Sequence, residues 1–159
     1  INNELVDKIG NFIHRVLVFY QDKLNQKIEN KNLDNEVLRK TEEVLCLYQD
    51  YLEKCEMVKA FNLILDYVNF ANQYIDKNEP WRLLIENKNK CEEIIFSSLQ
   101  IINNLRILLW PFIPQAMEEL SKLLNFKIET EIGKDNFIFS LIKNIKLIQK
   151  PEPLFKKLN

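Results

Sequence analysis

MVKAFNLILDYVNFANQYIDKNEPW, residues 57–81, predicts a long helix that lies between other helices. Its apolar residues recur at the spacing of three and four that places side chains on one helix face, and they do so on two faces. One stripe holds Phe61, Ile64, Leu65, Val68 and Ile75, and the other holds Leu63, Tyr67, Phe70 and Tyr74. A helix that is apolar on two sides is stable only when neighbours cover both. We therefore expect residues 57–77 to form a central helix.

The end of this segment predicts a bend. Pro80 is poorly tolerated inside a helix and disfavours helical geometry at Glu79, so Trp81 should lie at a joint. A Trp that directly follows a Pro is held stiffly, and a stiff aromatic ring is what an unstacked RNA base lies against. A packed hinge is the alternative interpretation of the same Pro-Trp pair.

Four further segments show helical spacing: residues 2–24, 34–54, 89–110 and 114–124. Asn2 and Asn3 are suitable caps for the first and Asp34 for the second, whereas Pro111 and Pro114 separate the last two. No segment before residue 126 alternates as a strand does. The fold class predicted is all-α, an antiparallel helix bundle over residues 1–125.

Residues 126–159 are expected to form an appendage that packs back on the bundle. Residues 126–148 are compatible with strand or helix, and we leave them open. Pro151 and Pro153 predict an extended tail, which Leu154 and Phe155 would anchor.

Composition limits the function. Apolar residues make up 47% and charged residues 28%, which excludes disorder, and no run approaches the roughly 18 apolar residues of a membrane span. The three cysteines and one histidine fit neither a metal site nor a disulfide framework, so a reducing cytoplasm is expected. Two glycines are too few for a phosphate-binding loop. No catalytic residues can be nominated, and the chain reads as part of a longer protein.

A net charge of -1 gives no general attraction to phosphate, so any nucleic-acid role must depend on local residues. Asn11 and Arg15 are four apart on the first helix and fall outside its apolar stripe. An amide and a guanidinium there could read the edge of a base. An ordinary solvated pair is the alternative.

Four segments in this order resemble the anticodon-binding domain of methionyl-tRNA synthetase, a class I aminoacyl-tRNA synthetase. They are NNELVDKIGNFIHR at 2–15, ANQYIDKNEPW at 71–81, LRILLWPFIPQAMEEL at 105–120 and KPEPLFKKL at 150–158. The resemblance implies a bundle that binds the anticodon loop of methionine tRNA, anticodon CAU, through Asn11, Arg15 and Trp81. The family often has a small residue where this chain has Glu79.

The resemblance also implies a second domain. A catalytic domain with HIGH-type and KMSKS-type motifs would precede this region and bind ATP and methionine, so this chain would need no cofactor and would be inactive by itself. Neither motif occurs here.

Supporting roles are expected for Asn72, Asp76 and Pro80, the first two by fixing the end of the central helix. DNA and membranes are not expected partners. The competing hypothesis is a non-catalytic protein-interaction or scaffolding bundle.

Overall fold

The computed structural model describes residues 3–28, 31–125 and 150–152. These ranges contain six helices and no strand, so the all-α prediction is confirmed. The helices are α1 Asn3–Asp22, α2 Asn35–Glu53, α3 Met57–Asn78, α4 Pro80–Glu86, α5 Lys88–Leu108 and α6 Pro114–Leu123.

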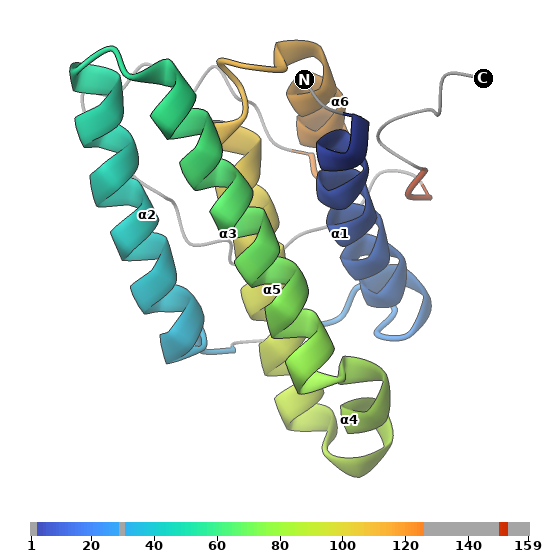
Figure 1. Cartoon of the computed structure of the whole chain (residues 1–159). Coiled ribbons are helices and arrows are strands. Elements are labelled where there is room, and N and C mark those ends of the chain that lie inside the picture. Colours follow the sequence, from blue (N-terminus) through green and yellow to red (C-terminus); the bar gives the residue numbers. More distant parts are fainter. Residues whose placement is uncertain (1–2, 29–30, 126–149, 153–159) are drawn as a thin grey trace.

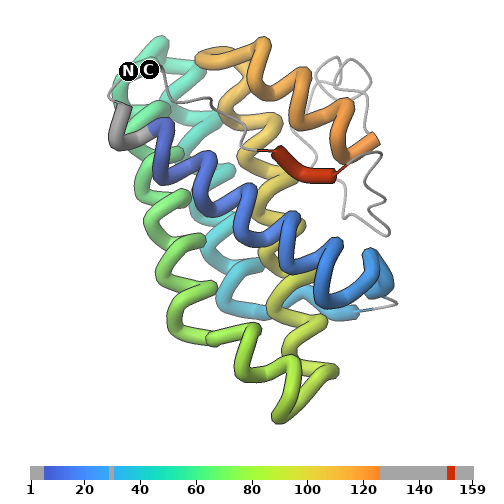
Figure 2. Tube along the Cα trace, turned by 90° about the vertical axis from the view of Figure 1, so that its right-hand side faces the viewer, coloured from blue at the N-terminus to red at the C-terminus, as the bar shows by residue number. Residues whose placement is uncertain are grey.

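Four long helices lie side by side, with the short α4 at one end of the bundle and α6 at the other (Figure 1). The side view shows α1 crossing in front of α5, with α3 beside it (Figure 2). α5 is the central element, because it contacts α1, α2, α3, α4 and α6. Every residue from Ser97 to Leu109 is buried. Central burial was predicted for α3, and α5 is covered more completely.

The polar side chains within this core are hydrogen-bonded to one another. The Tyr67 hydroxyl lies 2.7 Å from the Thr41 hydroxyl and accepts a hydrogen bond of 3.1 Å from the Asn104 amide. These three residues join α2, α3 and α5. A buried polar group left without a partner costs about 1–3 kcal/mol, so the network favours one relative placement of the three helices.

Asp34 fixes the start of α2, as its sequence position predicted. One carboxylate oxygen accepts from the Glu36 backbone N–H at 2.9 Å, and the other accepts from the Tyr74 hydroxyl at 3.0 Å. The first bond satisfies a free N–H of the first turn, and the second ties that end to α3. A single side chain thus sets both where α2 begins and what it lies against.

Two helix ends and one additional helix differ from the sequence prediction. α1 ends at Asp22 because Asn25 and Gln26 adopt positive φ values of 50° and 56°, which no helix continues through. α4 was not predicted at all, and α5 ends before Trp110. The alternatives for 126–148 and the anchoring by Leu154 and Phe155 lie outside the described residues, as does most of the appendage beyond residue 125; Pro151 is buried.

Across the described part of the chain, no helix combines the length and the apolar character needed to cross a membrane.

Candidate functional site

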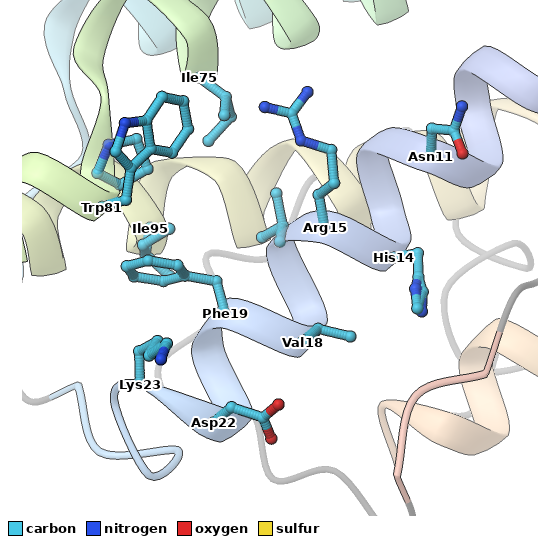
Figure 3. A pocket seen from close by; sticks show the side chains of 12 residues that line it. Asn11, His14, Arg15, Val18, Phe19, Asp22, Lys23, Ile75, Trp81 and Ile95 are labelled. Carbon is cyan, nitrogen blue, oxygen red and sulfur yellow. The ribbon is translucent and has the colours of Figure 1, made fainter.

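A pocket of about 420 Å³ opens between α1, the end of α3, the start of α4 and α5 (Figure 3). Asn11, Arg15 and Trp81 all line it, although Trp81 is separated from the other two by most of the first half of the chain. The structure therefore brings the three predicted site residues to one place. Pro80 also lines the pocket, whereas Asn72 does not.

Trp81 is positioned by the backbone joint between α3 and α4. Glu79 ends one helix and begins the next with φ 45° and ψ 61°, a left-handed conformation that costs a non-glycine residue about 1 kcal/mol. Its carbonyl accepts from the N–H groups of Arg82 and Leu83 at 2.9 and 3.1 Å. Pro80 occupies the first position of α4, where its fixed φ is favourable. Trp81, which follows, is left 47% exposed.

The joint is anchored from beneath. Pro80 is buried, and the Cys91 thiol on α5 donates to its carbonyl with an Sγ to O distance of 3.3 Å. Burial raises the pKa of the Cys91 thiol to about 11, so the thiol stays protonated and remains a donor at neutral pH. The residue before Trp81 is therefore held by α5 as well as by its own ring.

Glu79 does not line the pocket, and its charge is paired. Its carboxylate lies 2.9 Å from the guanidinium of Arg82, three residues along the chain. The left-handed backbone at this position also explains why a small residue is suited to it, since glycine adopts that geometry without steric cost.

Arg15 and Asp76 form an ion pair across the pocket rim, with 2.9 Å between the guanidinium nitrogen and the carboxylate oxygen. The prediction that Asp76 fixes the end of the central helix was wrong, because its carboxylate is directed to α1 instead. Asn78 bonds that end, donating to the Tyr74 carbonyl at 2.8 Å. Asn72 donates to the Val68 carbonyl at 3.1 Å, one turn back within α3.

Sequence reasoning missed several residues of the pocket. Phe19, Ile75 and Ile95 supply apolar lining beside Trp81, and Lys23 lies at the end of α1 (Figure 3). A signal for two of them was present, because positions 11, 15, 19 and 23 repeat every four residues along one helix face. His14 also lines the pocket, with its Nε2 buried and without a hydrogen-bond partner among the described residues.

The arrangement suits a flat ligand with a polar edge. An exposed indole and a half-buried phenyl ring offer faces, while an amide and a guanidinium offer hydrogen bonds at the side. The described residues contain no group of side chains that could hold a metal ion.

Comparisons with known proteins show the family to which the chain belongs. Residues 25–159 match the family model described as the anticodon binding domain of methionyl tRNA ligase. A methionine–tRNA ligase of Pyrococcus furiosus is 35% identical over 165 residues, covering 99% of this chain and 22% of that protein. One from Ignicoccus hospitalis is 33% identical over 160 residues, covering 99% and 28%.

The fold also matches a solved structure. The apo form of Mycobacterium tuberculosis methionyl-tRNA synthetase superimposes with a TM-score of 0.84 at 16% identity, over 98% of this chain and 33% of that one. The chain spans about a quarter of the length of the curated relatives named above. With a match over most of its length, this chain belongs to the family of methionyl-tRNA ligase anticodon-binding domains.

Proposed function

We propose that this chain binds the anticodon loop of methionine tRNA and reads its CAU anticodon, in support of ATP-dependent aminoacylation by a catalytic domain of the same enzyme. One observation carries the proposal: Trp81, a residue that is 47% exposed, lines a pocket that also contains Asn11 and Arg15. Membership of the family supports the choice of ligand.

Trp81 supplies affinity in this proposal. A cytosine turned out of the loop stacks on the indole, an interaction worth about 1–3 kcal/mol and nearly indifferent to which base is present. Glu79, Pro80 and Cys91 fix the backbone that carries the ring, which lowers the conformational entropy lost on binding. Stacking alone does not select cytosine.

Arg15 and Asn11 supply the choice of base. The guanidinium can donate to the carbonyl and ring nitrogen of cytosine, and the amide can accept from its amino group or donate to a neighbouring base. A different base leaves these groups without partners, at a cost of about 1–3 kcal/mol for each.

Electrostatic attraction has a small role. The whole chain carries a net charge of -1, and the charge of Arg15 is balanced by Asp76. A protein that neutralises few phosphates shows a shallow dependence of affinity on salt. We therefore expect binding to persist at salt concentrations that abolish nonspecific RNA binding.

The test compares binding of the 159-residue chain to an anticodon stem-loop with CAU and to one with the first anticodon base changed to U. The CAU loop should bind more tightly, and Trp81→Ala should weaken its binding roughly tenfold or more. Ile85→Ala is the matched control, because Ile85 is an 89% exposed apolar residue on α4 outside the pocket lining. Equal binding of both loops, governed by salt alone, would refute the proposal.

A further inference from the structure

The pocket extends beyond the residues to which a role has been given. Asn11, Arg15, Phe19 and Lys23 form a row on one face of α1, and all four line the pocket. Lys23 keeps this register although α1 ends at Asp22, because its backbone N–H donates to the Phe19 carbonyl at 2.9 Å. A four-residue step along a helix is about 6 Å, so the row continues for about 12 Å past Arg15.

The charges along the row are not equivalent. Arg15 is held by Asp76 at 2.9 Å, so much of its charge is compensated before any ligand arrives. Lys23 forms no ion pair with the other described residues and is exposed. Figure 3 shows Lys23 next to the ring of Phe19, whereas Asp22 points away from both. Of the two cations that line the described pocket, Lys23 is the one available to a phosphate.

Phe19 adds an aromatic face between the two charges. Its ring packs against the core without being fully buried, and it lies beside Ile95 below Trp81 (Figure 3). The ring and Ile95 leave an apolar surface in the lining of the open pocket of about 420 Å³. A base or ribose face would cover this part of the lining.

We infer that the RNA strand continues along α1, with the nucleotide next to the one stacked on Trp81 lying against Phe19 and its phosphate contacting Lys23. This rests on the proposed function, which it extends by a second nucleotide position. Phe19 gives affinity through contact with a flat face, and Lys23 fixes the path of the backbone without reading sequence.

The first experiment measures the affinity of the chain for the CAU stem-loop between about 50 and 200 mM salt. Lys23→Gln should weaken binding roughly three- to fivefold at the lower salt and reduce the salt slope by about 1, with the preference for CAU unchanged. Lys122→Gln makes the same charge change on α6 at the opposite end of the bundle, and it should have no effect. Equal effects of the two substitutions would overturn the inference.

The second experiment locates the phosphate. A neutral methylphosphonate replaces each anticodon-loop phosphate in turn. One replacement should weaken binding to the unaltered chain. The same replacement should not weaken binding to the Lys23→Gln variant further, because that variant already lacks the contact with the phosphate. If no replacement behaves in this way, Lys23 does not contact a phosphate.

The third experiment tests the ring. Phe19→Leu keeps an apolar side chain but removes the aromatic face, and it should weaken binding roughly fivefold or more. Phe19→Tyr keeps the ring and should bind as the unaltered chain does, which separates loss of stacking from loss of folding. Wild-type affinity of a folded Phe19→Leu chain overturns the role of the ring. If Trp81→Ala weakens binding while the Lys23 and Phe19 variants do not, the inference fails and the proposed function stands; if Trp81→Ala has no effect, the proposed function itself fails.

Discussion

The guanidinium of Arg15 on α1 lies 2.9 Å from the carboxylate of Asp76 on α3, across 61 residues of sequence. Both side chains are largely exposed, so the pair contributes only about 0–1 kcal/mol to folding. Its larger effect is on the orientation of the Arg15 side chain. An arginine that is already oriented loses less conformational freedom when it meets a ligand. The pair therefore prepares Arg15 for the hydrogen bonds proposed for it.

Replacing Arg15 tests whether it recognises the base or only attracts the RNA through its charge. Arg15→Ala should weaken binding to the CAU loop more than binding to the loop with the changed first base, because the hydrogen bonds to the edge of the cytosine are lost. The preference for CAU should therefore fall. Arg15→Lys keeps the charge without the planar fork of donors, and it should also lose the preference. The readout is the ratio of the two dissociation constants. A uniform drop for both loops would make Arg15 a phosphate contact instead.

Replacing Asp76 should have the opposite effect on affinity. Asp76→Asn removes a negative charge near the RNA and releases Arg15, so both loops should bind roughly twofold tighter or more while the difference between them shrinks. The free energy of unfolding, measured in urea, should change by less than about 1 kcal/mol. Unchanged discrimination would show that Asp76 does not orient Arg15.

The conformation of Glu79 predicts a stability difference between two small replacements. Glu79→Gly and Glu79→Ala both lose the ion pair with Arg82, but only glycine adopts φ 45° without steric cost. The glycine variant should be more stable by about 1 kcal/mol in urea unfolding. Equal midpoints would mean that the left-handed joint is not retained in solution.

The three thiols should differ in reactivity. Cys46 and Cys55 are exposed, whereas Cys91 is buried with its pKa raised to about 11. Because the thiolate is the reactive form, an aromatic disulfide reagent at about pH 8 should titrate two thiols rapidly and the third only on unfolding. Rapid reaction of all three would contradict the contact between Cys91 and Pro80.

The same pKa gives a pH dependence. Below the ordinary thiol pKa of 9.0 Cys91 is protonated whether the chain is folded or not, so stability does not depend on its ionisation there. As the pH rises from there toward about 11, the unfolded chain loses the proton that the folded chain keeps, and folding stability falls. Cys91→Ala should unfold with a weaker pH dependence over that interval, as thermal melts at several pH values would show.

Long patterned segments made most of the fold predictable. The start of α3 at Met57 and the cap at Asp34 agree with the prediction, because a two-sided apolar pattern and a capping carboxylate are local signals. α4 was missed since its seven residues are too few for a period to show, and Pro80 was taken as a stop although proline also suits the first position of a helix.

The site was less predictable than the fold. Asn11, Arg15 and Trp81 were predicted from the family resemblance, and the first two also from their position outside the apolar stripe of their helix. All three line the pocket. Phe19 follows Asn11 and Arg15 at the same spacing of four, but it belongs to a helix rich in apolar residues, so the sequence does not distinguish it from a core residue. The pairing of Asp76 with Arg15 depends on how α1 lies against α3, which local patterns do not contain.

A backbone hinge, rather than interior packing, carries the indole at position 81. A side chain placed in this way depends for its position on the backbone of residues 79 and 80 more than on the core beneath it. Domains of this shape could therefore acquire new ligand preferences through a few surface substitutions while their helices stay as they are.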